Sequence, residues 1–299
     1  MATNYRRCFS AAAILSTSFF FCIGGTFARD HSYSRSAVSG NDPEFRDLGK
    51  ADIAAAGRAL NLPLPQASAK IIGGVEAAEK EFPFIVSLRA AQGHFCGGSL
   101  IKKNWVLTAG HCAFVNSFAK DGLVVIGARD LRQTDGIEVF HPEKVIRHPG
   151  YRGNPPDYDF ALIRLDGDSK FAPIALNREE LNGDRDLVTA GWGKTTEDPW
   201  STSGLSKVLM KVTVPLVSVE RCSKAYPKEI TDRMICAGFD EGGRDHCYGD
   251  SGGPLILGTG PDGVLAGVVS WANGCARPKQ YGVSGKVSSV ISWIEDTIK

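Results

Sequence analysis

The densest group of reactive side chains in this sequence lies between Asp245 and Pro254. The segment reads Asp-His-Cys-Tyr-Gly-Asp-Ser-Gly-Gly-Pro, with Ser251 near its end. Glycines beside a serine allow a sharp turn and bring backbone N–H groups close to a ligand. An acyl-transfer site needs an exposed hydroxyl and N–H donors aimed at the oxygen that becomes negative. The segment therefore predicts a nucleophile at Ser251, although a turn-rich loop without chemistry has a similar composition.

Two earlier segments supply the partners that a serine nucleophile needs. Residues 107–112 read Leu-Thr-Ala-Gly-His-Cys and contain His111, and residues 157–163 read Asp-Tyr-Asp-Phe-Ala-Leu-Ile. A serine hydroxyl is a weak nucleophile until a neighbouring base takes its proton, and histidine titrates near neutral pH. A carboxylate can orient that imidazole and stabilise its charged form. Asp157 and Asp159 both qualify, because residues two apart in a strand point to the same face.

The order histidine, aspartate, serine, with the motifs around them, resembles the trypsin-like serine proteases of the chymotrypsin family. The resemblance runs from the Ile-Ile-Gly-Gly segment at residues 71–74 to the C-terminus. It implies a catalytic triad of His111, Asp159 and Ser251, because Asp-Phe-Ala-Leu-Ile matches the family's Asp-Ile-Ala-Leu-Ile segment at Asp159. It also implies an oxyanion hole made by the N–H groups of Gly249 and Ser251.

The resemblance gives two further aspartates separate tasks. Family members become active when the chain is cut before the Ile-x-Gly-Gly segment, which here means between Lys70 and Ile71. The new α-amino group of Ile71 would then pair with Asp250, whose charge is costly to bury alone. Asp245, six residues before Ser251, matches the aspartate at the floor of the trypsin pocket, which selects Lys or Arg side chains.

Several positions around this pocket depart from the trypsin pattern. His246 stands where a small residue is usual, Ala272 replaces a glycine of the pocket wall, Ser284 replaces a tyrosine, and Tyr248 is bulkier than usual at the rim. These changes predict weaker selection of Lys or Arg, with the hydrolytic mechanism unchanged. The resemblance implies that the substrate-binding residues are Asp245, His246, Ser270, Trp271, Ala272 and Gly282.

The cysteines indicate an oxidising compartment. No C-x-x-C motif occurs, and the neighbours His111 and Cys112 cannot easily bind one zinc ion together. In the family's calcium loop, Asp135 and Glu138 remain as candidate ligands, but Ala128 stands where a glutamate normally coordinates. We therefore expect neither a metal nor another cofactor. Disulfides contribute about 2–4 kcal/mol each in exported proteins, and the resemblance pairs Cys96 with Cys112, Cys222 with Cys236, and Cys247 with Cys275.

The N-terminal region predicts export and processing. Residues 1–28 have a basic start, an apolar middle and a Thr-Phe-Ala end, which is typical of a secretory signal peptide. An uncleaved membrane anchor is the alternative for this segment. Residues 29–70 are interpreted as a propeptide, with a disordered tail as the alternative. The expected location is secreted and extracellular, or periplasmic in a bacterium, without membrane attachment once the signal is removed.

Residues 71–299 form the expected protease domain. Short apolar runs separated by turn residues indicate an all-β protein, and the resemblance specifies two six-stranded antiparallel β-barrels, at about 71–176 and 177–299. Apolar residues at helical spacing from Val287 to Ile298 predict a C-terminal α-helix. The net charge of +1, without a basic run, argues against nucleic-acid binding.

These observations lead to one main functional hypothesis and two alternatives. The main hypothesis is a secreted, monomeric zymogen that becomes a serine endopeptidase cutting after Lys or Arg through an acyl-enzyme. Its expected partners are protein or peptide substrates, an activating protease and protein protease inhibitors. One alternative is an inactive homologue kept as a binding module, which a missing His, Asp or Ser would indicate. The other is a protease selecting small or aromatic side chains, which Asp245 opposes.

Overall fold

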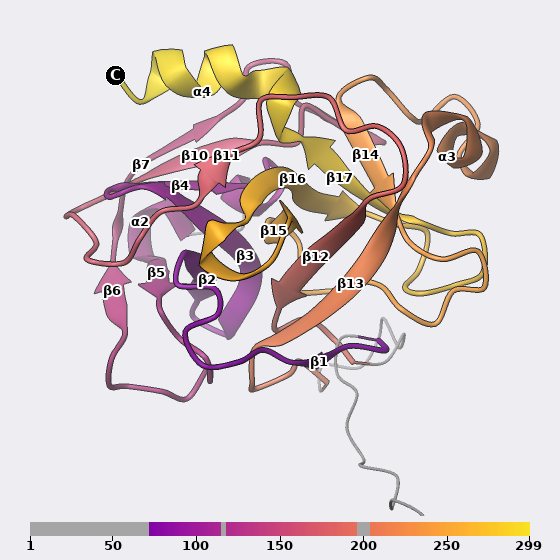
Figure 1. The fold of residues 1–299 in the computed structure, drawn as a ribbon. Coiled ribbons are helices and arrows are strands. Elements are labelled where there is room, and N and C mark those ends of the chain that lie inside the picture. Colours follow the sequence, from indigo (N-terminus) through magenta and orange to yellow (C-terminus); the bar gives the residue numbers. More distant parts are fainter. Residues whose placement is uncertain (1–71, 115–117, 196–203) are drawn as a thin grey trace, which may run out of the picture. The chain divides into compact units, whose positions relative to one another are not determined.

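The computed structural model describes residues 72–114, 118–195 and 204–299, all within the compact unit Pro65–Lys299 (Figure 1). The expected signal peptide, propeptide and cleavage site between Lys70 and Ile71 lie outside the described residues. None of the helices formed by the described residues is long and apolar enough to cross a membrane.

The first sheet curls into a barrel. Its strand order is β6-β5-β2-β3-β4-β10-β7. Only His141 separates β6 from β7, so residues 138–147 pair with β5 at one end and with β10 at the other. Counted as one bent strand, this segment closes a ring of six. The strands are β2 (Ile85–Ala90), β3 (Gly93–Lys102), β4 (Trp105–Thr108), β5 (Leu123–Ile126), β6 (Glu138–Phe140), β7 (Pro142–Arg147) and β10 (Ala161–Leu165).

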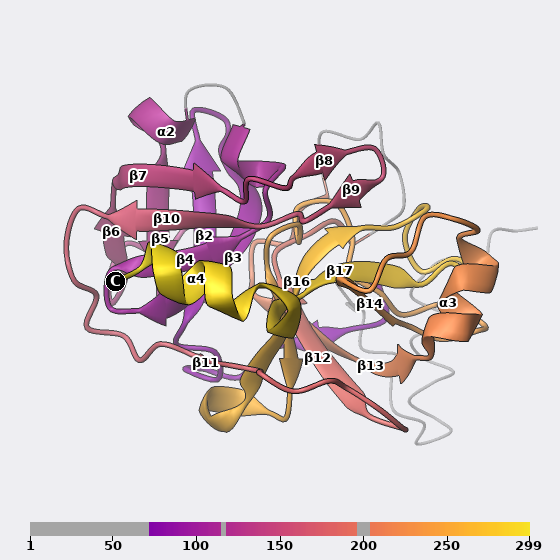
Figure 2. The same cartoon turned by 90° about the horizontal axis from the view of Figure 1, so that it is seen from above.

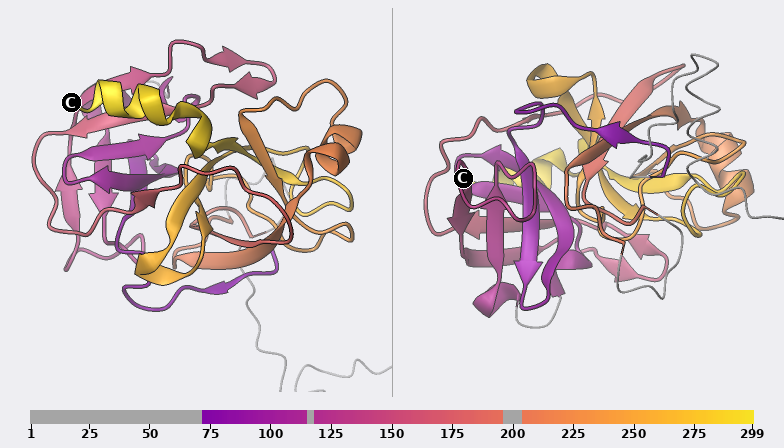
Figure 3. Two further views of the ribbon diagram at one scale, coloured as in Figure 1. Left: turned by 45° about the horizontal axis from the view of Figure 1, so that its top comes forward. Right: turned by 90° about the horizontal axis from the view of Figure 1, so that it is seen from below.

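Short elements connect the strands of this first barrel. A 3-10 helix (Cys112–Phe114) follows β4, and α2 (Phe118–Asp121) precedes β5. The small hairpin of β8 (Arg152–Gly153) and β9 (Pro156–Asp157) precedes β10. Figure 2 shows this hairpin extending from the end of β7 toward the second barrel, and the left panel of Figure 3 agrees.

The second sheet also closes on itself. Strands β13, β12, β15, β16, β17 and β14 form a ring, because β14 pairs with both β17 and β13. Two short strands pair with this ring: β1 (Val75–Glu76) pairs with β13, and β11 (Ala175–Leu176) pairs with β16. Helix α3 (Val219–Ala225) lies between β13 and β14, and a 3-10 helix (Gly260–Asp262) between β15 and β16. The ring strands are β12 (Asp186–Gly191), β13 (Met210–Val217), β14 (Met234–Ala237), β15 (Pro254–Leu257), β16 (Val264–Trp271) and β17 (Gly282–Lys286).

The C-terminal helix packs against the first barrel. It consists of a 3-10 turn (Val287–Val290) followed by α4 (Ile291–Thr297), and Figure 2 shows it across β4 and β10. Val287, Val290 and Ile294 are buried in the same apolar cluster as Leu100 and Ile163 of the first barrel. The helical spacing read from the sequence thus corresponds to a buried face. The predicted all-β fold with a C-terminal helix is confirmed.

Candidate active site

The pairing of β4 with β10 brings His111 and Asp159 together. Thr108 at the end of β4 lies opposite Ala161 at the start of β10, so the residues just beyond these strand ends are neighbours. The Nδ1 atom of His111 and the Oδ2 atom of Asp159 are 2.8 Å apart, and the backbone N–H of His111 donates to Oδ1, also at 2.8 Å. This pairing leaves Nε2 of His111 as the nitrogen that can take a proton from a substrate or nucleophile.

Asp159 is an ionised carboxylate held from both barrels. It is 2% exposed, and the hydroxyl of Ser270 on β16 donates to its Oδ2 atom at 2.5 Å. Burial acts to raise the pKa of Asp159, but hydrogen bonds from His111 and Ser270 outweigh it and lower the pKa. Gly110 permits this close packing, because a Cβ there would lie 3.2 Å from Oδ1 of Asp159. The sequence reasoning placed Ser270 in the substrate pocket and missed its bond to Asp159.

Ser251 lies in the loop before β15, next to the segment that carries His111. The backbone N–H of Gly97 on β3 donates to the carbonyl oxygen of Ser251 at 2.8 Å. The Sγ atom of Cys112 lies 3.6 Å from the same oxygen. Within the described part of the chain, Nε2 of His111 and Oγ of Ser251 make no hydrogen bond to each other. Such bonds often tighten only when substrate is bound.

Two peptide N–H groups in the Ser251 loop are candidates for an oxyanion hole. Gly249 has a φ of 100°, a conformation that side chains disfavour. Among the described residues, the N–H groups of Gly249 and Ser251 have no hydrogen-bond acceptor. Two such donors are what an oxyanion requires. They are the two residues that the resemblance implies for an oxyanion hole.

His94 holds the Gly249 peptide, and sequence reasoning missed it. Its Nε2 atom lies 3.0 Å from the carbonyl oxygen of Gly249, and its Nδ1 atom lies 2.9 Å from Oγ of Ser87. Burial lowers the pKa of His94 to about 4, so the ring is neutral near pH 7. Neutral His94 therefore donates from Nε2 to Gly249 and accepts at Nδ1 from Ser87. Only the folded arrangement reveals this role, because His94 and Gly249 are 155 residues apart in the sequence.

Asp250 is buried at the back of the same loop. It is 1% exposed and accepts hydrogen bonds from the N–H groups of Gly193 and Cys247, at 2.8 and 2.9 Å. A Cβ at Gly193 would lie within 2.3 Å of this carboxylate, so the glycine is needed for the close approach. Burial raises the pKa of Asp250 to about 6. No ion pair to Asp250 is found among the described residues, and its expected partner Ile71 lies outside them.

A pocket of about 200 Å³ opens beside Ser251. Of the residues expected to bind substrate, four line it and two do not. Asp245 and Gly282 are absent from the lining. The pocket is lined by His246, Cys247, Tyr248, Ser251, Ser270, Trp271, Ala272, Gly274 and Cys275.

His246 lines this pocket, and its neighbour Asp245 is buried behind the lining residues. Asp245 is 2% exposed, and its two oxygens accept hydrogen bonds from the N–H groups of His246 and Ala276, at 2.8 and 3.1 Å. The Nε2 atom of His246 lies 3.8 Å from Oδ1 of Asp245 and is buried without a hydrogen-bond partner. A Cβ at Gly282 would lie 2.3 Å from this Nε2, so Gly282 makes room for the imidazole.

All three disulfides implied by the resemblance are present. They join Cys96 to Cys112, Cys222 to Cys236, and Cys247 to Cys275. The first anchors the segment that carries His111, and the third ties together two sides of the pocket. Cys96, Cys112 and His111 lie within metal-ligand distance of one another, but both sulfurs are already bonded and are not thiolates.

The loop between Gly127 and Glu138 does not fit a calcium ion. The side chain of Gln133 accepts from the N–H of Arg129 and donates to the carbonyl oxygen of Asp135, at 3.1 and 2.6 Å. The Glu138 carboxylate accepts from the hydroxyl of Ser169 at 2.5 Å. These groups satisfy each other within the protein, and Ala128 offers no side-chain oxygen.

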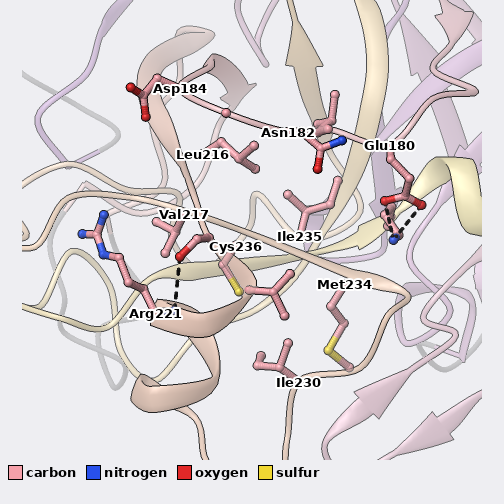
Figure 4. A pocket seen from close by; sticks show the side chains of 15 residues that line it. Glu180, Asn182, Asp184, Leu216, Val217, Arg221, Ile230, Met234, Ile235 and Cys236 are labelled. Carbon is pink, nitrogen blue, oxygen red and sulfur yellow. Dashed lines mark hydrogen bonds and ion pairs between the residues drawn. The ribbon is translucent and has the colours of Figure 1, made fainter.

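A second pocket, of about 300 Å³, lies on the second barrel near α3 (Figure 4). Apolar side chains of β13 and β14 line it, including Leu216 and Ile235. At its edge, Nζ of Lys286 contacts the Glu180 carboxylate at 2.9 and 3.0 Å. None of the expected catalytic residues lines this pocket.

Comparisons with known proteins agree with this arrangement. Residues 71–294 match the family model described as Trypsin. The chain is 43% identical over 240 residues to Trypsin 5G1 of Aedes aegypti, covering 77% of this chain and 86% of that protein. It is 38% identical over 234 residues to the trypsin of Sus scrofa, covering 77% and 96%. It is 40% identical over 237 residues to Trypsin-1 of Astacus astacus, covering 75% and 98%.

Proposed function

Because the chain belongs to the trypsin family and is a serine endopeptidase, we propose that it is secreted as a zymogen that cuts peptide bonds after Lys or Arg. The observation that carries this proposal is the paired His111 and Asp159 beside the Ser251 loop. A base oriented by a carboxylate next to a serine is the arrangement that acyl transfer requires.

In the proposed mechanism, Ser251 attacks the substrate carbonyl carbon while Nε2 of His111 takes the hydroxyl proton. Asp159 stabilises the resulting imidazolium, which fits its lowered pKa. The N–H groups of Gly249 and Ser251 bind the negative oxygen. His111 then gives its proton to the leaving amine, and water hydrolyses the acyl-enzyme by the same steps in reverse order.

Activation is proposed to follow cleavage between Lys70 and Ile71. Asp250 supports this, because it is buried with a raised pKa and lacks an ion-pair partner among the described residues. An ammonium group beside it would lower its pKa and hold it ionised. The new N-terminus would thereby fix the loop that carries Gly249 and Ser251.

The proposed preference for Lys or Arg depends on the negative charge of Asp245, which lies behind His246 as seen from the pocket. A cationic substrate side chain entering the pocket meets the His246 imidazole, which is part of the pocket lining, whereas Asp245 is not. Asp245 supplies negative charge 3.8 Å further on. Ala272 narrows the same pocket. We therefore propose selection of Lys and Arg that is weaker than in a trypsin with small residues at these two positions.

The proposed setting is the extracellular space, or the periplasm of a bacterium. Three disulfides support an oxidising compartment. An activating protease and protein protease inhibitors are the proposed partners besides substrates, and the active form is proposed to be a monomer.

Controlled activation followed by substrate profiling tests this proposal. The purified full chain is treated with trypsin and assayed against a peptide library that varies the residue before the cut. We expect activity to appear with cleavage, N-terminal sequencing to read Ile-Ile-Gly-Gly-Val, and Arg and Lys to be preferred. Lys70→Gln should stay inactive under the same treatment. A fully active chain still joined at residue 70 would contradict the activation step, and a preference for small or aromatic residues would contradict the specificity.

A further inference from the structure

Asp157, the rejected candidate for the catalytic aspartate, makes its own set of contacts between the two barrels. Its carboxylate receives two hydrogen bonds from the Arg233 guanidinium, at 3.0 Å to Oδ1 and 2.8 Å to Oδ2. The hydroxyl of Thr231 donates to Oδ1 at 3.1 Å. Thr231 and Arg233 precede β14 of the second barrel, whereas Asp157 ends β9 before the first-barrel strand β10. A two-point Arg–carboxylate pair fixes orientation as well as distance.

Tyr158, between this aspartate and Asp159, has an unfavourable backbone conformation. Its φ is 48°, in the left-handed region that a bulky side chain rarely adopts. Such a conformation persists only where the surroundings impose it. Here the N–H of Tyr158 donates to Oδ1 of Asp157 at 3.0 Å. Its carbonyl oxygen accepts from the N–H of Phe160 at 2.8 Å, so a tight turn encloses Asp159.

The Tyr158 ring is held by two further side chains. The ring of His148 stacks on it with centres 4.5 Å apart and planes 5° apart. The guanidinium carbon of Arg233 lies 4.6 Å from the Tyr158 ring centre, a cation–π distance. His148 is itself fixed, because its N–H donates to the carbonyl oxygen of Phe160 at 2.9 Å and its Nδ1 accepts from Gly150. Arg233 thus contacts both residues that precede Asp159: the carboxylate of Asp157 and the ring of Tyr158.

The electrostatics of Asp157 agree with a permanent ion pair. Burial acts to raise the pKa of the Asp157 carboxyl, but the hydrogen bonds from Arg233 and Thr231 outweigh it and lower the pKa. The same contact raises the pKa of Arg233. Both groups are therefore charged at every pH at which the enzyme is expected to act.

We propose that Asp157, Tyr158 and Arg233 form a clamp that positions Asp159 against His111. The clamp holds the tight turn in its left-handed conformation and ties it to the second barrel. The same barrel supplies Ser251 and the Ser270 hydroxyl that binds Asp159. The clamp touches neither substrate nor the reacting atoms, so these are positioning residues. This inference rests on the proposed role of Asp159.

Arg233→Met is the first test, made in the active enzyme with Arg178→Met as the matched control. Arg178 pairs with Glu295 on the surface, so its loss should change nothing. For Arg233→Met we expect kcat to fall roughly 10- to 100-fold, as for a misplacement near 1 Å, with KM changed less than about twofold. The acid limb of the pH–rate profile should move to lower pH, because a displaced Asp159 stabilises the His111 imidazolium less.

Two Tyr158 variants separate the backbone from the ring. Tyr158→Phe keeps the stacked ring and should behave as wild type. Tyr158→Asn tolerates the left-handed conformation but loses the ring contacts, and should lower kcat as Arg233→Met does. Combining Tyr158→Asn with Arg233→Met should add little further loss, since both break one clamp. The proton NMR signal of the hydrogen bond between His111 and Asp159 should weaken or shift in each impaired variant, which assigns the effect to that pair rather than to His148.

The clamp is refuted if folded Arg233→Met and Tyr158→Asn melt earlier but keep wild-type kcat, acid limb and NMR signal. If Arg233→Met does not fold, Asp157→Asn replaces it, because this change keeps the shape of the side chain and removes its charge. A reduced kcat with a shifted acid limb supports the clamp, and wild-type kcat, acid limb and NMR signal refute it. Failure of the triad itself would appear differently, as undiminished activity in folded Asp159→Asn.

Discussion

Two aspartates of this enzyme are equally buried, but their pKa values are shifted in opposite directions. Asp159 and Asp245 are each 2% exposed. The pKa of Asp159 is lowered, because hydrogen bonds from His111 and Ser270 outweigh burial. The pKa of Asp245 is raised by burial, which its neighbour His246 and two backbone N–H donors do not offset. The partners of a buried carboxylate therefore determine the direction in which its pKa shifts, and burial alone does not.

The comparison extends to the two sites that these aspartates serve. Changes in the cluster of His111, Asp159 and Ser251 should lower the rate for every substrate. Changes in the pocket built on Asp245 and His246 should instead alter the ranking of substrates.

Ser251→Ala should reduce kcat by on the order of 10⁴–10⁶, equally for all substrates, because the hydroxyl forms the acyl bond. The measurement is peptide hydrolysis after activation, with a thermal melt as the control for folding. Turnover comparable to wild type in the folded variant would rule out the serine mechanism.

Asp159→Asn should reduce kcat by about 10⁴, again for all substrates, because an amide does not hold the imidazole as the carboxylate does. Asp166→Asn is a suitable control, since Asp166 contacts His141 at the surface. A loss confined to Lys and Arg substrates would show that Asp159 acts in specificity, and would overturn the division.

Asp245→Ser should remove the preference for Arg over a neutral residue. The kcat/KM for an Arg substrate should fall ~10²-fold or more, while hydrolysis of neutral substrates changes little. The reason is that truncating one partner of a buried charge pair typically costs 2–5 kcal/mol. A peptide library read before and after the substitution measures this. If the preference survives, the substrate's positive charge is recognised elsewhere.

His246→Ser combined with Ala272→Gly should raise kcat/KM for an Arg substrate about tenfold, since it opens the pocket down to Asp245. An unaltered rate for Arg would show that the imidazole does not obstruct the pocket.

The smallest expected effect is on the pH dependence of stability. The lowered pKa of Asp159 means that its contribution is present above the ordinary value of 3.8 and is lost as pH falls through its folded pKa. The raised pKa of Asp245 has the opposite sign, because its ionisation opposes folding as pH rises through its folded pKa. Carbon NMR of the two carboxyl groups should find Asp159 titrating below 3.8 and Asp245 above it. Equal titration would remove the basis of the comparison.

The sequence alone determined the fold class and the candidates for the chemistry. The runs at Trp105–Leu107 and Leu123–Ile126 fall within β4 and β5, because β-branched and aromatic residues between turn residues have few other stable arrangements. The triad candidates were readable because their motifs are local in the sequence. Asp159 was favoured over Asp157 from such a motif, and the structure brings Asp159 to His111.

Only the tertiary structure decided what lies between distant segments. Three contacts join residues far apart in the chain. They are the hydrogen bond of Ser270 to Asp159, the hydrogen bond of His94 to Gly249, and the ion pair of Arg233 with Asp157. Sequence patterns do not report such contacts, since they depend on how two barrels pack. The pocket beside Ser251 is the clearest case: the resemblance implied Asp245 at its floor, and the structure has His246, but not Asp245, among the lining residues.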